Sequence, residues 1–380
     1  MKHYSVPSDF KKSTIDTFFE LNKKYADTKV AEVYGQLTDQ NIWGSGRSAD
    51  CVPETDMETL KAYVDYARNK DIKFNYTMNA TCMGNKEFTE KGISELYRFL
   101  CSLQAIGISD LTVALPSVME LVKMTGLNFK IKTSVLGGIT NVSKAMSYKS
   151  LGADKIVIDE SINRQFHVIR NICNAFGPAV EIIVNVVCYK NCIYRPFHYN
   201  QMSHDISSEC KGMTYYSHRC LLKRMESAAN IMRLNWIRPE DIKYYNEIGI
   251  QYFKIQGRQA AVKGDIFRTV ESYMREEYDG NLLELLDAFL PTSSFHPHIP
   301  NKKLDNFIQP FIENDNFCSN DCHGCQYCDL FFADKINKRE VERLYSIGES
   351  FIREVDSFIQ IMPSLKLNNT DNNSSATPEK

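Results

Sequence analysis

Cysteine is the residue type best placed to do chemistry in this chain, because eight of the twelve cysteines fall into two groups of four. The first group spans 33 residues and comprises Cys188, Cys192, Cys210 and Cys220. The second group spans only 11 residues and comprises Cys318, Cys322, Cys325 and Cys328. In a chain that we expect in the reducing cytosol, this grouping predicts two metal sites rather than disulfides. Thiolates ligate both zinc and iron–sulfur clusters, so the residue type alone leaves both metals open.

The first group lies in a long excursion that follows a predicted strand. Its irregular spacing lacks the paired short CxxC knuckles of structural zinc sites, which favours an iron–sulfur cluster. Loops of this length tend to be functional or disordered. Residues that could replace one of the four thiols lie in the same stretch or on neighbouring loops, and they are His198, His204, His218, Cys51 and Cys82.

The second group has the pattern Cys-x3-Cys-x2-Cys-x2-Cys, which is too dense to be a feature of packing. Its first three cysteines have the CxxxCxxC spacing of radical-SAM enzymes. In those enzymes the barrel follows the motif, whereas here it precedes the motif, and we therefore disfavour a radical-SAM core. An auxiliary iron–sulfur cluster and a structural zinc remain, and the ferredoxin-like spacing favours iron–sulfur. We expect His323, within the run, to be a solvated loop residue.

The elements that must position these thiols form a repeating pattern. From residue 29 onward, β-rich runs alternate with helical patterns, which predicts parallel strands and a closed (β/α)8 TIM-like barrel. An open doubly wound sheet is the alternative, although its glycine-rich phosphate fingerprint is missing after the first predicted strand. The predicted strands are Lys29–Leu37, Lys73–Asn79, Asp110–Leu115, Asn128–Ser134, Asp154–Ile158, Glu181–Val187, Asn235–Ile237 and Gln251–Ile255. The predicted helices include Met57–Asn69, Thr89–Ile106, Val142–Leu151, Asn163–Ala175 and Pro239–Ile248.

We expect three regions along the chain. Residues 1–290 would form the barrel, with the cysteine-bearing insertion at 188–220, and residues 291–364 a cysteine-rich extension with a C-terminal helix. Residues 365–380 are rich in Asn, Ser and Thr and are expected to be disordered. An apolar stripe predicts that the helix covers Asn337–Ile361, and its members are Val341, Leu344, Ile347, Phe351, Val355 and Phe358.

The composition and net charge of the chain indicate which cellular compartment and which kinds of binding partner to expect. The start of the chain leads into a polar segment rather than into the apolar core of a signal peptide. No apolar run is long enough for a membrane span, so we expect a cytoplasmic protein. The formal net charge of −2 gives no overall basic footprint, which favours a small-molecule or carrier-bound substrate without excluding nucleic acid.

In a barrel of this type, catalytic residues lie at the C-terminal ends of the strands. Asp159 and Glu160 follow the fifth predicted strand and are candidates for a general acid or base. Neighbouring strand residues point to opposite faces, so we expect only one of the two to face inward. The other would be a helix cap or a charge at a helix N-terminus.

Four further residues near strand ends are candidates for substrate binding, namely Arg238, Lys254, Arg258 and Asn79. The planar fork of arginine suits carboxylate or phosphate groups. Structural alternatives remain for two of them. Arg238 could cap the helix that begins at Pro239, and Lys254 could pair with a buried acid.

The segment from Asp159 to Arg258 resembles the collagenase-like "peptidase of unknown type" family. The pieces that carry the resemblance are Asp-Glu-Ser-Ile-Asn-Arg at 159–164, the cysteine-bearing loop, Arg-Pro-Glu-Asp at 238–241 and Phe-Lys-Ile-Gln-Gly-Arg at 253–258. Gln256 stands where the family has glutamate. The family's Gly-Ala-Leu-Cys run is replaced by Asn-Val-Val-Cys at 185–188, and the second cysteine group is an addition.

The resemblance implies a barrel that holds a four-cysteine iron–sulfur cluster. Members of the family take part in O2-independent hydroxylation of ubiquinone, tRNA or ribosomal RNA, with prephenate implicated as the oxygen source. Other relatives carry a protease label. This resemblance makes Arg238, Arg258 and Lys254 candidates for binding a dicarboxylate.

Three functions follow as hypotheses. The first is an O2-independent hydroxylase with one or two 4Fe–4S clusters, or with zinc at the second site. The second is a peptidase or other hydrolase, although the chain has neither a His-Glu-x-x-His helix nor a Gly-x-Ser-x-Gly elbow. The third is a non-catalytic, metal-stabilised subunit that forms a heterodimer with a related protein.

Overall fold

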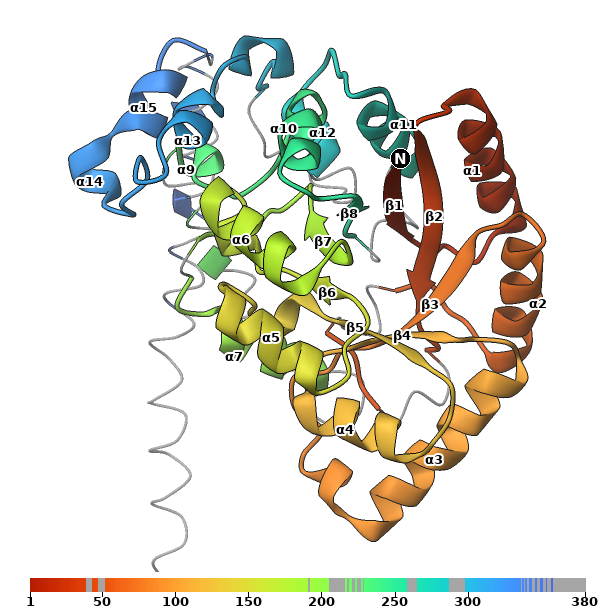
Figure 1. Cartoon of the computed structure of the whole chain (residues 1–380). Coiled ribbons are helices and arrows are strands. Elements are labelled where there is room, and N and C mark those ends of the chain that lie inside the picture. Colours follow the sequence, from red (N-terminus) through yellow and green to blue (C-terminus); the bar gives the residue numbers. More distant parts are fainter. Residues whose placement is uncertain are drawn as a thin grey trace, which may run out of the picture.

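The computed structural model is a barrel of parallel strands with helices around its outside (Figure 1). It describes residues 1–38, 43–46, 52–190, 192–204, 229–257, 265–286 and 298–335, together with a few positions in 216–227 and 337–357. Eight strands form one sheet in the order β5-β4-β3-β2-β1-β8-β7-β6. A parallel bridge between Lys132 and Lys155 brings the two edge strands together. The predicted (β/α)8 TIM-like fold is confirmed.

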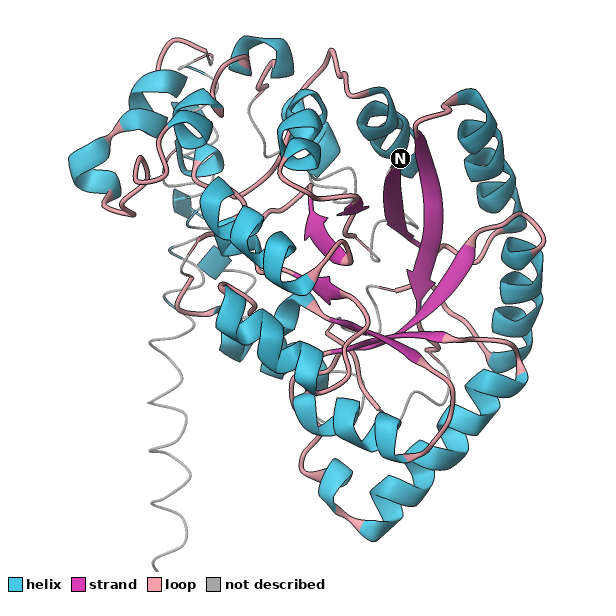
Figure 2. Ribbon diagram, viewed as in Figure 1, coloured by secondary structure: helices cyan, strands magenta, loops and turns pink. Residues whose placement is uncertain are grey.

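The strands occupy the inside of the molecule, and the helices cover the outer face of the sheet (Figure 2). Seven of the predicted strands are present, most of them shorter than expected. The eight strands are β1 Lys2–Pro7, β2 Thr28–Gly35, β3 Lys73–Met78, β4 Asp110–Val113, β5 Lys130–Thr133, β6 Ile156–Val157, β7 Val180–Ile183 and β8 Tyr252–Lys254.

The prediction of a strand at Asn235–Ile237 is wrong, and the first strand of the barrel was missed. Residues 235–237 run as an irregular connection, pinned by a hydrogen bond from the Ile237 amide to the Val184 carbonyl at 2.8 Å. The missing strand is β1, which lies between β2 and β8. Its polar Ser5 points into the barrel interior and donates to Glu32 at 2.7 Å, and such inward polar residues hide the strand from an apolar pattern.

The five predicted helices are present, with small shifts at their ends. Several begin at side chains that accept a hydrogen bond from the first turn, such as Asp56, Thr89 and Asn141. The helices around the barrel are α1 Lys12–Lys24, α2 Met57–Arg68, α3 Glu90–Ala105, α4 Pro116–Met124, α5 Val142–Ser150, α6 Phe166–Phe176, α10 Ile242–Glu247 and α11 Ile266–Arg275.

Further helices lie in the insertion after β7 and in the C-terminal part of the chain. They include α7 Arg195–His204, α9 Ala229–Met232, α12 Leu282–Leu286, α13 Gln309–Glu313, α14 Cys322–Cys325 and α15 Tyr327–Phe332. The short 3-10 helices are Lys86–Phe88, Val135–Gly137, Glu160–Ile162, Pro239–Asp241 and Asn301–Leu304. Every helix in the described residues is too short or too polar to cross a membrane.

A buried ionic layer fills part of the barrel interior. The Lys132 ammonium lies 2.9 Å from Glu181 and also contacts Glu32, and all three side chains are buried. Asn75 donates to Glu32 at 3.3 Å. Burial alone would raise the pKa of Glu32, but the Lys132 charge outweighs it and lowers that pKa to about 2.

The C-terminal segment, residues 298–335, packs on the side of the barrel beside α6, α9 and α10 (Figure 1). Phe307 packs against Trp236, with ring centroids 5.5 Å apart, and stacks on Tyr327 at 5.6 Å. The predicted boundary at 290/291 lies outside the described residues. The apolar stripe predicted for Asn337–Ile361 and the predicted tail 365–380 lie outside them as well.

Candidate functional site

A hollow of about 320 Å³ opens among the loops that follow the C-terminal ends of the strands. We call it the outer hollow. Its walls come from the loops after β3, β5 and β6 and from the insertion that follows β7, which includes α7. This is the face on which TIM-like barrels carry their active sites. The lining residues are Thr81, Leu136, Gly138, Asp159, Ser161, Cys192, Arg195, Pro196, Tyr199 and Asn200.

One guanidinium in this wall holds both predicted catalytic carboxylates. Arg195 lies 3.0 Å from the Asp159 carboxylate, to which it donates, and 2.9 Å from the Glu160 carboxylate. The second contact is an ion pair without hydrogen-bond alignment. Asp159 and Glu160 are buried, so the charge of Arg195 is their main compensation.

Asp159 lines the outer hollow, and it is also the helix cap that we expected one member of the pair to be. The chain leaves the strand after Ile158, and Asp159 becomes the N-cap of a 3-10 helix that begins at Glu160. The Asp159 carboxylate accepts a hydrogen bond from the Ser161 amide at 2.8 Å. Because the turn ends the alternation of strand side chains, both carboxylates reach the same partner.

The two carboxylates differ in their electrostatic surroundings. Burial would raise the pKa of Asp159, but Arg195 outweighs it, so the pKa lies below its usual value. Deeper burial raises the pKa of Glu160 despite the same arginine, with a further contribution from Asp159. Burial would lower the pKa of Arg195, but Glu160, Tyr199 and Asp159 raise it. Asp159 therefore remains the more readily ionised member of the pair.

A second, smaller hollow of about 50 Å³ lies within the mouth of the barrel, and we call it the inner hollow. It contains two of the predicted substrate-binding residues. The Lys254 ammonium lies 3.9 Å from the centre of the Tyr34 ring, and Asn79 accepts a hydrogen bond from the Gly46 amide at 3.0 Å. Tyr199 lines both hollows, which therefore adjoin one another. An ammonium and an amide at the base of one hollow suit an anionic or hydroxyl-bearing ligand.

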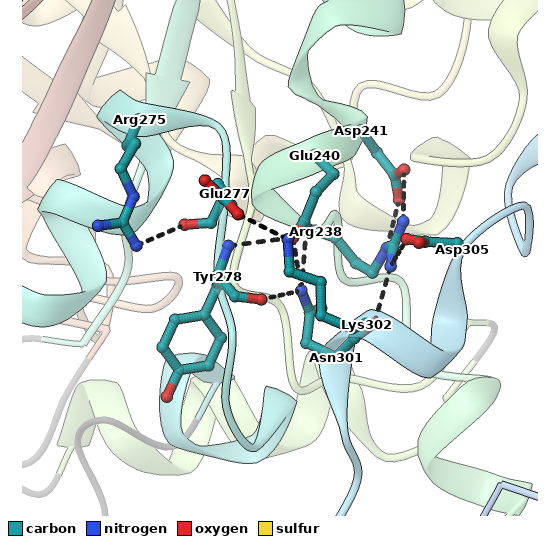
Figure 3. A network of polar contacts seen from close by, with 9 residues as sticks. All are labelled: Arg238, Glu240, Asp241, Arg275, Glu277, Tyr278, Asn301, Lys302 and Asp305. Carbon is teal, nitrogen blue, oxygen red and sulfur yellow. Dashed lines mark hydrogen bonds and ion pairs between the residues drawn. The ribbon is translucent and has the colours of Figure 1, made fainter.

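Arg238 differs from the expected substrate-binding position. Figure 3 shows its guanidinium directed toward the C-terminal segment. It donates to the Asn301 carbonyl at 2.9 Å and to Asp305 at 3.0 Å, and it pairs with the buried Asp241. Each of its three guanidinium nitrogens therefore has a partner within the protein. It lines neither hollow, and the fourth predicted residue, Arg258, lies outside the described residues.

The first cysteine group reaches the same mouth of the barrel. Cys192 lines the outer hollow. The Cys188 thiol lies 3.9 Å from the Tyr199 hydroxyl and also contacts the Glu160 carboxylate. Cys220 is half-buried in the same insertion, whereas Cys210 lies outside the described residues.

Among the residues considered as replacement ligands, His198 stacks on Tyr199, with ring centroids 5.8 Å apart. Cys82 is half-buried, and His204 is exposed. Cys51 and His218 lie outside the described residues.

The second cysteine group surrounds a different hollow, on the C-terminal segment. Cys318, Cys322, Cys325 and Cys328 all line this space of about 30 Å³. Its other walls include Arg233 and an aromatic group formed by Phe311, Phe317 and Tyr327. Within the described residues, no three His, Cys, Asp or Glu side chains are arranged to hold a single metal ion.

Sequence reasoning missed Arg195, Asn200 and Thr81. The Thr81 hydroxyl donates to the Asn200 side chain at 2.7 Å, which ties the loop after β3 to α7. A signal for Arg195 existed, since two adjacent acids at a strand end need a cation and Arg195 lies three residues after Cys192. Its pairing depends on how the insertion folds back over β6, which residue spacing does not reveal.

Comparisons with known proteins agree with this architecture. The family model described as "Peptidase family U32" matches residues 44–281. The "Uncharacterized protease MJ1657" of Methanocaldococcus jannaschii is 30% identical over 330 residues, which cover 85% of this chain and 95% of that protein. The structure of the U32 peptidase Mk0906 aligns with a TM-score of 0.50 at 17% identity, covering 68% of this chain and 93% of Mk0906, which supports the fold. On the family match and the curated relative together, this chain belongs to peptidase family U32.

Proposed function

We propose that this protein is an iron–sulfur enzyme that hydroxylates a small-molecule or carrier-bound anionic substrate without O2, with a prephenate-type oxygen donor. The observation that carries the proposal is the composition of the outer hollow, where the Cys192 thiol, the Asp159 carboxylate and the Arg195 guanidinium line one space. A thiol group beside a charged pocket at the C-terminal end of a barrel combines a site for a redox group with a site for a substrate.

The residues of the insertion fit an iron–sulfur cluster. Cys188 and Cys192 lie at the mouth of the barrel, and Cys220 and Cys210 belong to the same insertion. Thiolates are the ligands that such clusters prefer. When bound, the cluster would supply one-electron redox chemistry next to the hollow.

The charged residues would bind and orient the substrate. Lys254 places an ammonium in the inner hollow, where it can attract a carboxylate that enters from the outer hollow. Asn79 lines the same space and can hydrogen-bond a hydroxyl or carbonyl group. Asp159 faces the outer hollow and is the residue positioned to accept a proton from the substrate. Arg195 is a positioning residue, because it fixes the orientation of the Asp159 carboxylate.

The first test is anaerobic purification followed by iron, sulfide and zinc analysis, together with an absorption spectrum. We expect about four irons and four sulfides for the first site. Cys188→Ala/Cys192→Ala should lose this iron, whereas Cys101→Ala, a half-buried thiol on α3 outside both groups, should keep it. Prephenate-dependent hydroxylation by the loaded wild type would support the reaction. Equal iron content in both variants, or loaded protein inactive on every hydroxyl acceptor tried, would contradict it.

Peptide hydrolysis is the second candidate, because the family and the curated relative both carry a peptidase name. Asp159 would then be the residue that activates water in the outer hollow. A panel of fluorogenic peptides tests this candidate. Cleavage that disappears in Asp159→Asn but persists in Cys188→Ala/Cys192→Ala would replace the redox proposal with a hydrolytic one.

A further inference from the structure

The second cysteine group lies beyond the part of the chain that the family model matches. The match ends at residue 281, and the four thiols come from residues 318–328. The structure nevertheless gathers all four around one hollow. Their function therefore needs an explanation separate from that of the barrel mouth.

A short capped turn brings these thiols together. Asp321 is the N-cap of α14 and accepts a hydrogen bond from the Gly324 amide at 3.0 Å. A Cβ atom at position 324 would lie 2.5 Å from the Asp321 carboxylate, so glycine leaves room for the cap in its present geometry. Asn320 and Gln326, on either side of the turn, adopt left-handed backbone conformations, with φ of 68° and 52°. These sharp bends let thiols from four points of the chain face the same space.

The four thiols around this hollow differ in how far they are exposed to solvent. Cys318 and Cys328 pack against the main apolar core, whereas Cys322 and Cys325 are exposed. The aromatic wall is rigidly packed, with the Phe317 and Tyr327 ring centroids 4.9 Å apart and nearly perpendicular. A metal could therefore enter from solvent past Cys322 and Cys325 and be held against Cys318 and Cys328.

Positive side chains border the hollow. The Lys190 ammonium lies 3.8 Å from the Cys318 thiol, and Arg233 forms part of the wall while it pairs with Asp329. The buried Arg164 lies behind the aromatic residues, 5.5 Å from the centre of the Phe311 ring. Four thiolates around a metal would concentrate negative charge here, and these cations lie where they would offset it.

We propose that Cys318, Cys322, Cys325 and Cys328 form a second soft-metal centre, which holds either an iron–sulfur cluster or zinc and draws the four thiols closer together than they now lie, and that this centre positions the active-site insertion. Four thiolates around such a metal core leave a net charge of about −2, which attracts Lys190. Lys190 lies midway between Cys188 and Cys192, so a metal at the second centre holds the turn that carries two thiols of the first. The proposal does not depend on the hydroxylation reaction.

The first experiment measures metal and acid-labile sulfide in the anaerobically prepared full-length chain. Cys322→Ser/Cys325→Ser is the test variant, since both thiols are exposed, and Cys101→Ser is the matched control. We expect the double variant to lose about four irons with their sulfide, or about one zinc, and the control to lose none. The metal that disappears identifies the occupant. Unchanged metal content in a double variant with wild-type circular dichroism would overturn the proposal.

The same measurement on Cys188→Ala/Cys192→Ala separates the two sites. We expect that variant to retain the metal of the second centre. If it loses no metal while Cys322→Ser/Cys325→Ser does, the first centre has failed and the second stands.

The coupling between the centres is tested by hydrogen exchange of residues 188–204. We expect exchange to become several-fold faster in Cys322→Ser/Cys325→Ser and in Lys190→Gln, which removes the charge. Lys190→Arg should restore the wild-type rate because it keeps a cation at that position. Equal rates in all four proteins would show that the second centre does not hold the insertion.

Discussion

The Arg195 guanidinium lies 3.0 Å from the Asp159 carboxylate and joins the cysteine-bearing insertion to the end of β6. The same arginine reaches Glu160, whose side chain contacts Cys188. One residue therefore links the candidate substrate pocket, the acidic pair and the first cysteine group.

Replacing Arg195 with alanine should destabilise the protein by about 3 kcal/mol, because two buried carboxylates would lose their cation. Urea unfolding of the full-length chain measures the change. Arg98→Ala, an exposed arginine on α3, is the control and should change stability by less than about 0.5 kcal/mol. If Arg195→Ala were as stable as the control, the ion pairs of Arg195 with Asp159 and Glu160 would contribute nothing to the stability of the folded state.

Lys132→Met should be among the most destabilising single substitutions in the barrel. It would leave Glu32 and Glu181 buried beside each other without their main cation, at a cost of about 3–5 kcal/mol. Lys123→Met removes a solvent-exposed ion pair with Asp154 and should cost less than about 1 kcal/mol. Unfolding curves for the two variants make the comparison, and similar losses in both would disprove a special role for the interior layer.

Acid should weaken the same layer over a defined range of pH. The pKa of Glu32 is lowered from 4.5 to about 2 by Lys132, despite burial. Its contribution to stability is therefore complete above pH 4.5 and is lost as the pH falls toward 2, because the unfolded chain then binds the proton first. The free energy of unfolding of wild type should decline across this window by on the order of 3 kcal/mol more than that of Glu32→Gln. Parallel pH profiles for the two proteins would argue against the shift.

Arg238→Ala should loosen the docking of the C-terminal segment rather than weaken ligand binding. The substitution removes the bonds to the Asn301 carbonyl and Asp305 and leaves the buried Asp241 without its cation. We expect a stability loss of about 2–4 kcal/mol and faster hydrogen exchange in residues 298–308. Arg275→Ala, on α11, alters a weaker contact of the same region and serves as the control. Unchanged exchange in residues 298–308 would show that Arg238 does not hold the C-terminal segment in place.

Local sequence patterns were sufficient to predict much of the secondary structure of this protein. Strands such as Lys73–Met78 and helices such as Glu90–Ala105 were predictable because period and caps are set by near neighbours in the chain. The two cysteine groups were evident for the same reason, since the spacing of their cysteines can be read directly along the chain. The prediction of the barrel followed from the alternation of the elements, although one strand was misplaced.

The tertiary structure decided what depends on distant residues. Lys2–Pro7 is a strand because β2 and β8 supply its partners, and its inward Ser5 is accommodated by Glu32. Arg195 meets Asp159 across 36 positions of sequence, and Arg238 meets Asp305 across 67. Ion pairs of this kind depend on how loops return to the barrel, and nothing in the local spacing encodes that return. The sequence alone therefore singled out the cysteines that we propose as metal ligands, and only the packed barrel decided which charges stand beside them.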